Sequence, residues 1–215
     1  ALNETKEVLG SRDFAALYQQ TPVVAGGNII KEKWLQFYAP GQLPFKTNEI
    51  KPNNIVQAWD LQFKKTGSSY TVGGCVVRHE GSFYLVDFWR KKADIIETQD
   101  AIVSLKKRWP RCNSVLIEEK ANGNAIIDLL KKKTSGLIPF NPEGSKEERL
   151  NAYVAPIAEA GNLYLPLNTP YTKDIIDELV SFPNSANDDI CDMISMALAR
   201  FNKLRGLDKL RALAG

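Results

Sequence analysis

The residues of this sequence that could do chemistry are its acids, and the densest group of them lies late in the chain. The stretch SANDDICDMISMALAR, residues 185–200, places Asp188, Asp189 and Asp192 at the start of an otherwise apolar helix. Asp189 and Asp192 are spaced i, i+3, and Asp188 and Asp192 are spaced i, i+4, so either pair can share one helical face. Like charges gathered at the start of a core helix repel one another. The group therefore predicts either a helix start or one part of a metal site.

Two predicted strands also end in acids. Asp60 closes the apolar run IVQAWD, in which alternation puts it on the same face as the other even-numbered residues. Glu118 and Glu119 close the run SVLIEE. If these two strands are adjacent and parallel, Asp60 and Glu118 meet at one sheet edge, where open α/β sheets commonly place their sites. The final helix can then bring Asp189 and Asp192 against them.

A cluster of carboxylates at one sheet edge would need a cation. Mg²⁺ and Mn²⁺ are hard ions that take oxygen ligands, and carboxylates are their usual protein donors. Two such ions about 3.5–4 Å apart can activate a water and stabilise the leaving oxygen of a phosphodiester. Simpler interpretations stay open for each acid alone, because Asp60 can be a turn residue, Asp188 an N-cap, and the glutamates solvated.

Composition limits the other kinds of chemistry. The chain has 215 residues, of which 44% are hydrophobic, and a formal net charge of +3, which neither requires nor excludes a nucleic-acid partner. Cys75, Cys112 and Cys191 are widely spaced. Their odd number and wide spacing disfavour a disulfide framework. His79 is the only histidine, so a Cys/His zinc site and a Ser-His-Asp triad are disfavoured as well. No apolar run of membrane-spanning length and no signal pattern is seen, so we expect no membrane partner.

The elements that position the acids alternate in type along the chain. Apolar runs rich in β-branched residues predict strands at 54–60, 69–80, 82–92, 113–119, 136–140 and 162–167. Helical spacing predicts helices at 93–110, 122–133, 145–161, 172–182 and 188–204. The third helix opens with a Ser145–Glu148 capping box. The order predicts an α/β fold, a mixed sheet of three antiparallel strands followed by parallel strands, with helices on both faces.

Three parts are expected along the chain. Residues 1–50 are rich in Pro, Gly and Asn after a short helical pattern, which predicts an extended lead-in packed on the remainder. Residues 51–205 form the α/β domain. Residues 206–215 are expected to be a flexible tail, either a frayed helix or a disordered end.

The strand order and the placement of the acids resemble the ribonuclease H-like nuclease fold. More specifically, the chain resembles the C-terminal nuclease domain of the terminase large subunit of tailed bacteriophages, the DNA-packaging motor protein. The resemblance runs through the segments FAALYQQTP, QAWDLQFKKTGSSYTVGG, VLIEEKANGNAIIDLLK, GSKEERLNAYVAPIAEAGNLYLP and NDDICDMISMALA. The first of these is similar to the segment that leads out of the family's ATPase domain, so residues 1–50 are expected to be a linker from it. No GxxxxGK[ST] motif is present, and no ATPase activity is expected from this chain.

The resemblance implies a metal-dependent endonuclease that cuts concatemeric viral DNA during genome packaging, with a two-metal site for Mg²⁺ or Mn²⁺. Carried over by position, Asp60 would be the central acid that touches both ions. Glu118 would be the second ligand and Asp189 the third. Asp192, one helical turn further on, matches the paired acid of resolvase-like members of the fold.

Two other acids are reserve candidates for the same site. Glu119 ranks below its neighbour because alternation puts it on the opposite strand face. Asp188 is the other reserve. The family often has a histidine just before its acidic pair, whereas this chain has Asn187 there, so no general-base histidine is expected.

Basic residues near the acids are the candidates for holding DNA. Contacts to phosphates give salt-dependent, sequence-independent binding. The basic runs at 90–92, 106–108 and 131–133 are more typical of solvated surface. The residues predicted to contact DNA are Lys64, Lys65, Lys120, Lys146 and Arg149.

The resemblance also implies partners and a place. The partners would be double-stranded viral DNA and, in the full-length protein, an ATPase domain, the portal protein and the small terminase subunit. The place would be the host cytoplasm, at the procapsid. Two alternatives remain open: a Holliday-junction resolvase or RNase H-type nuclease, and a non-catalytic module of the same fold that docks DNA or the portal. A docking module has no need of Asp60, Glu118 and Asp189 together, which favours a nuclease.

Overall fold

A mixed β-sheet runs through the centre of the protein. The computed structural model describes residues 28–62, 70–119 and 123–214, and within these ranges the sheet has seven strands in the order β1-β7-β4-β3-β2-β5-β6. The strands are β1 (Gln36–Tyr38), β2 (Ile55–Asp60), β3 (Thr71–His79), β4 (Ser82–Lys91), β5 (Ser114–Glu118), β6 (Leu137–Phe140) and β7 (Leu163–Pro166).

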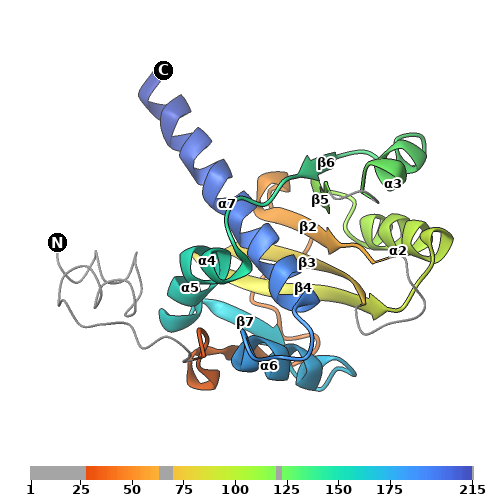
Figure 1. The fold of residues 1–215 in the computed structure, drawn as a ribbon. Helices are drawn as coiled ribbons and strands as arrows, with labels where there is room; N and C mark the ends of the chain where they lie inside the picture. Colours follow the sequence, from red (N-terminus) through yellow and green to blue (C-terminus); the bar gives the residue numbers. More distant parts are fainter. Residues whose placement is uncertain (1–27, 63–69, 120–122, 215) are drawn as a thin grey trace.

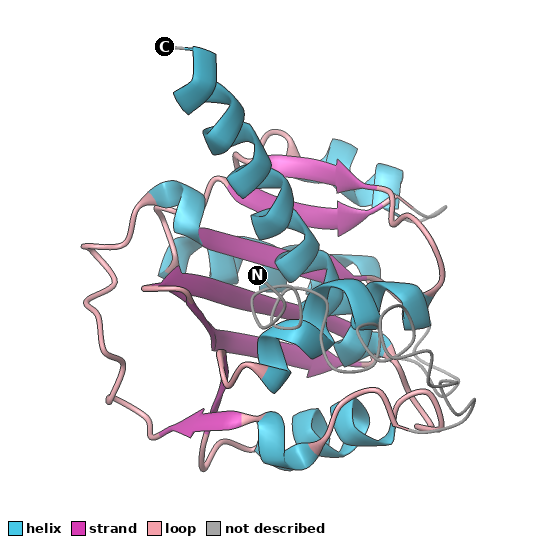
Figure 2. Cartoon of the chain, turned by 90° about the vertical axis from the view of Figure 1, so that its left-hand side faces the viewer, coloured by secondary structure: helices cyan, strands magenta, loops and turns pink. Residues whose placement is uncertain are grey.

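Helices cover both faces of this sheet (Figure 1). One face carries α2 (Ile95–Arg108) and α3 (Gly123–Leu130). The other face carries α4 (Lys146–Arg149), η3 (Leu150–Val154), α5 (Ala155–Glu159), α6 (Thr172–Ser181) and α7 (Asp189–Ala214). Helix α7 crosses in front of the strands in Figure 2, and its C-terminal end extends beyond them. Two short 3₁₀ helices are η1 (Glu32–Trp34) and η2 (Pro52–Asn54).

The strand directions confirm the predicted fold class. Strands β2, β3 and β4 form an antiparallel meander, whereas β5 pairs parallel with β2 and β6 pairs parallel with β5. A two-residue turn joins β3 to β4, and both of its residues have positive φ, 48° at Glu80 and 85° at Gly81. This is the backbone of a type I′ turn, whose twist matches that of antiparallel strands.

The two faces of β2 belong to two separate cores. Val56 and Ala58 pack in the core under α7, whereas Ile55 and Trp59 pack in the core under α2 and α3. The expected alternation is therefore confirmed, and it directs Asp60 toward the α7 face. On the neighbouring strand β3, two adjacent glycines leave space for one large side chain on each face. A Cβ at Gly73 would overlap the Trp59 indole, and a Cβ at Gly74 would overlap Met193 of α7.

The described part of the lead-in contributes to the same sheet. Strand β1, which the sequence did not predict, pairs parallel with β7 at one edge. The Tyr38 hydroxyl donates a hydrogen bond of 2.8 Å to the Leu85 carbonyl on β4. Burial raises the pKa of Tyr38 to about 12. The buried residues of this segment that join the core under α7 are Ile29, Ile30 and Leu35.

The helix predicted at 145–161 is not one regular helix. It begins with the predicted capping box at Ser145, but the α-helical turn α4 passes into the π-helical turn η3 before α5 begins. The wider turn lies just before Pro156, whose ring and missing N–H disfavour a regular α-helical turn at that point.

The final helix is longer than predicted. It was predicted to end at residue 204 and continues to Ala214, which agrees with the helical alternative for the tail, residues 206–215. None of the helices in the described part of the chain is both long enough and apolar enough to cross a membrane.

Candidate active site

Asp60 and Glu118 end neighbouring parallel strands. Trp59 pairs with Ile117, so the two acids form the next pair in the same register. Leu116, two residues before Glu118, packs in the core under α7, as Ala58 does beside Asp60. Both carboxylates are therefore directed to the α7 face, from strands whose backbones lie about 4.8 Å apart. Both side chains are buried, with 3% exposure each.

Asp189 reaches the same edge from the start of α7. Its Oδ2 accepts a hydrogen bond of 3.0 Å from the backbone N–H of Tyr70. Tyr70 directly precedes β3, in which Val72 pairs with Asp60. Asp189 is only 3% exposed, and burial raises its pKa while the Tyr70 hydrogen bond opposes that shift. The structure thus brings Asp60, Glu118 and Asp189 to one end of the sheet.

The first turn of α7 is capped by an acid from another helix. Glu178 of α6 accepts hydrogen bonds on Oε1 from the backbone N–H groups of Ile190 and Cys191, at 2.6 and 3.2 Å. Asp188, the predicted N-cap, directly precedes α7 and its backbone carbonyl accepts the Asp192 N–H at 3.0 Å, while its carboxylate pairs with Lys146. Burial raises the pKa of Glu178 to about 7, although the two backbone donors oppose the shift.

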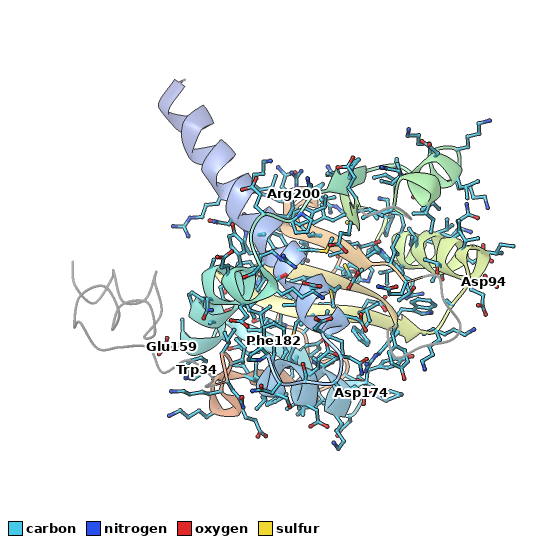
Figure 3. The ribbon with its side chains drawn as sticks, viewed as in Figure 1. Trp34, Asp94, Glu159, Asp174, Phe182 and Arg200 are labelled. Atoms are coloured by element: carbon cyan, nitrogen blue, oxygen red, sulfur yellow. The ribbon has the colours of Figure 1, made fainter. Side chains whose placement is uncertain are left out.

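Arg90 of β4 ties this cap to the segment that holds Asp189. Its guanidinium lies 3.1 Å from Asp174 Oδ2 and 3.6 Å from Glu178 Oε2. It also lies over the Tyr70 ring, 4.1 Å from the ring centroid. Asp174, labelled in Figure 3, lies on the same helix as Glu178. Arg90 belongs to the basic run 90–92, which was expected to be solvated, yet its side chain is only 10% exposed.

The other two acids of the cluster are paired with cations from α4. Lys146 Nζ lies 2.7 Å from Asp188 Oδ1 and 2.5 Å from Asp192 Oδ2. The Arg149 guanidinium binds Asp192 Oδ1 as well, and donates a hydrogen bond of 3.0 Å to the Gly144 carbonyl. Burial lowers the pKa of Lys146, but its hydrogen bonds to the two aspartates more than compensate, so the pKa is raised. Asp192, at 1% exposure, is therefore neutralised within the chain.

The predicted DNA contacts and the reserve acid Glu119 lie in different surroundings. Lys64, Lys65 and Lys120 lie outside the described residues. Lys146 is one-third exposed beside the acids, whereas Arg149 is buried against Asp192. Glu119 is exposed, donates its backbone N–H to the Phe140 carbonyl at 2.8 Å, and lines a cavity of about 540 Å³ with residues of β6 and α7. Arg200 of α7, labelled in Figure 3, lines the same cavity.

The donor set has the chemistry of a site for a hard divalent ion. Three buried carboxylates, Asp60, Glu118 and Asp189, lie at one end of the sheet, and such oxygen donors are those that Mg²⁺ and Mn²⁺ prefer. Within 28–62, 70–119 and 123–214, no three Asp, Glu, His or Cys side chains already stand close enough together to enclose an ion. The three carboxylates are therefore suitable metal ligands by their chemistry and by the face of the sheet on which they lie, although they do not enclose an ion in this conformation.

A three-stranded antiparallel meander extended by parallel strands, with acids at the ends of β2 and β5 and on the last helix, is an RNase H-like arrangement. The sequence pattern of the terminase RNase H-like domain family matches residues 57–201, so the chain belongs to this family. No curated protein matches the chain by sequence.

Solved structures of phage terminases share this fold. The large terminase nuclease of the thermophilic phage G20c superposes with a TM-score of 0.59 at 17% identity, covering 80% of this chain and 98% of that one. The nuclease domain of the large terminase of Thermus phage P74-26 gives 0.54 at 17% identity, with 80% and 94% covered. The large terminase of another thermophilic bacteriophage gives 0.68 at 12% identity, covering 92% of this chain but only 51% of that one.

Sequence reasoning missed the residues that hold Asp189. Glu178 lies in an ordinary amphipathic helix, twelve positions from the first N–H it accepts, so no local capping pattern marks it. Tyr70 acts through its backbone, which carries no signal in the sequence. Arg90 could have been singled out only by its position at the end of a strand that faces α6.

Proposed function

We propose that this domain is a metal-dependent DNA endonuclease that cuts concatemeric viral DNA during genome packaging, by phosphodiester hydrolysis with two divalent ions. The observation that supports the proposal is that Asp60 and Glu118 follow the paired residues Trp59 and Ile117, while Asp189 is hydrogen-bonded to the residue that precedes β3 at the same end of the sheet. Membership of the terminase RNase H-like domain family supports it. The phage G20c nuclease, which shares the fold, has been determined with bound magnesium, cobalt or zinc.

Each acid has a distinct part in the proposed mechanism. When bound, the divalent ions would activate a water and neutralise the charge that develops on the phosphodiester. Asp60 and Glu118 would hold the ions from two strands, whose hydrogen-bonded backbones fix the carboxylates. Asp189 would complete the ligand set from α7. Lys146, held in place by Asp188 and Asp192, would face a phosphate of the DNA from its exposed side.

The proposed partners follow from the same family. The substrate would be double-stranded viral DNA, and the setting the packaging machinery in the host cytoplasm, with portal protein and small terminase subunit. The longer large terminase, of which this domain covers about half, has also been determined with ADP and with ATP-γ-S. Because this chain spans only that share of it, we propose that an ATPase domain accompanies the nuclease in the full-length protein.

Cleavage of a supercoiled plasmid tests the proposal directly. We expect nicking and linearisation with Mn²⁺ or Mg²⁺ and none in EDTA. Asp60→Asn should lower the rate by about 10³-fold or more, because it removes a group that acts on the reacting atoms. Asp128→Asn is the matched control, since Asp128 is an exposed acid of α3 on the opposite face. Undiminished cutting by Asp60→Asn would refute the proposed mechanism.

Substrate choice separates the alternatives. A terminase-type nuclease should cut linear duplex and plasmid DNA. Strong cleavage of four-way junctions without cleavage of linear duplex would identify a resolvase instead. Binding of DNA with no cleavage in any divalent ion would identify a docking module.

A further inference from the structure

The first turn of α7 is held by groups that are not themselves metal ligands in the proposed mechanism. We propose that Glu178 and Arg90 are positioning residues for Asp189, and that they set the affinity of the site for its divalent ion. This inference rests on the proposed function, because it concerns how one of the proposed ligands is presented.

Glu178 fixes the backbone of this turn. The N–H groups at the start of a helix have no partner within the helix. Here the N–H groups of Ile190 and Cys191, the two residues after Asp189, both donate to Glu178 Oε1. Glu178 is only 5% exposed and comes from α6, so its hydrogen bonds attach the start of α7 to a separate helix. A shift of this carboxylate would shift the Asp189 backbone with it.

Arg90 joins the two contacts that locate Asp189. One arm of the guanidinium faces Glu178 Oε2 at 3.6 Å and the other binds Asp174 at 3.1 Å. Its flat face lies 4.1 Å from the centroid of the Tyr70 ring, and the Tyr70 N–H holds Asp189 Oδ2. Glu178 thus holds the backbone that follows Asp189, and the Tyr70 N–H holds its carboxylate. Arg90 contacts both Glu178 and Tyr70. Partners of this kind orient metal ligands and tune the affinity of many metal sites.

The inference can be tested by measuring Mn²⁺ binding in the absence of DNA, with the EPR signal of free Mn²⁺ as the readout. Glu178→Ala removes the acceptor for both N–H groups, and we expect Mn²⁺ to bind about 10-fold to 100-fold more weakly. Glu178→Gln keeps a side-chain oxygen at that position, so its affinity for Mn²⁺ should fall much less. Asp177→Ala is the matched control, because Asp177 is an exposed acid of the same helix that pairs only with Lys173 among charged groups in the described part of the chain. It should bind Mn²⁺ as the wild type does.

A split between two kinetic quantities distinguishes positioning from a general loss of folding. For Glu178→Ala, the Mn²⁺ concentration that gives half-maximal plasmid cleavage should rise, while the rate at saturating Mn²⁺ approaches that of the wild type. A purely structural role would instead lower the rate at every Mn²⁺ concentration, and that result would overturn the inference. Arg90→Gln leaves the capping carboxylate in place, and the same measurements can be made on this variant if Glu178→Ala does not fold. Mn²⁺ binding by folded Arg90→Gln that equals the wild type would overturn it as well.

The outcomes also separate this inference from the proposed function. If the wild-type protein binds no Mn²⁺ and cuts no DNA, the proposed function fails and the inference fails with it. If the wild type binds Mn²⁺ and folded Glu178→Ala binds it equally well, the metal site stands and only the positioning role is lost.

Discussion

Asp189 and Asp192 lie one helical turn apart on α7 and are both almost fully buried, but their surroundings differ. Both oxygens of Asp192 contact cations of α4, from Lys146 and Arg149. Asp189 accepts a backbone hydrogen bond and forms no ion pair with the described residues. A buried carboxylate must be compensated, and Asp192 is compensated within the chain whereas Asp189 is compensated only in part. The comparison favours Asp189 as the metal ligand and Asp192 as a structural partner of α4.

The largest effect should be on catalysis at Asp189. Asp189→Asn keeps the shape of the side chain but weakens its hold on a divalent ion. We expect plasmid cleavage to fall by about 10³-fold or more, measured at saturating Mn²⁺. If Asp192→Asn loses as much activity as Asp189→Asn after correction for the folded fraction, the proposed difference between the two acids is wrong.

The second-largest effect should be a loss of stability on substitution of Asp192. Asp192→Asn leaves Lys146 and Arg149 without the carboxylate between them, and removal of one partner of a buried ion pair costs about 3–5 kcal/mol. We expect a loss of about 3 kcal/mol in the free energy of unfolding, measured in urea without metal. Asp189→Asn should lose far less, since no buried cation is left unpaired. Equal losses in the two variants would contradict the distinction.

Metal should stabilise the protein through only one of the two acids. A ligand at about 100 times its Kd adds about 2.7 kcal/mol to the free energy of unfolding if it binds only the folded state. We expect Mn²⁺ to raise the Tm of the wild type and not that of Asp189→Asn. Thermal unfolding with and without EDTA measures this. A full Mn²⁺ shift in Asp189→Asn would remove that residue from the ligand set.

The smallest effect should appear at alkaline pH. The folded-state pKa of Lys146 is raised above its usual 10.5, so its ion pairs contribute fully below about that pH and are lost as the pH rises further. Because the side chain is one-third exposed, we expect the wild type to lose only about 1 kcal/mol more than Lys146→Met between about pH 8 and pH 11.5. Urea unfolding of both proteins at the two pH values checks this. Parallel curves would show that the pair contributes nothing.

Local patterns predicted most of the fold. Alternation in IVQAWD placed Asp60 on the correct face, and the Ser145–Glu148 capping box was visible as four letters. Strand β1 escaped prediction because three residues show no clear alternation, and its partner β7 lies more than a hundred residues further on. The π turn η3 escaped as well, since Pro156 predicts a disturbance in a helix but not its form.

The positions of the candidate acids could be predicted from the sequence, but their surroundings could not. Strand ends and helix starts can be predicted from sequence, so Asp60 and Glu118 could be assigned to the ends of neighbouring parallel strands and Asp189 to the start of the last helix. Which acids are neutralised depends on contacts between distant elements, as Lys146 with Asp192 and Arg90 with Glu178 illustrate. No spacing in the chain encodes those pairs.

Because of the π turn between α4 and α5, the pairing of Asp192 on α7 with the cations of α4 depends on the number of residues between Ser145 and Pro156. A π turn holds one residue more than the α-turn that could replace it, and each residue rotates a helix by about 100°. A relative with one residue fewer between Ser145 and Pro156 would keep the same basic side chains but turn them to another side of the helix. Its counterpart of Asp192 would then lack its cations, so a single insertion or deletion could reassign that acid without changing it.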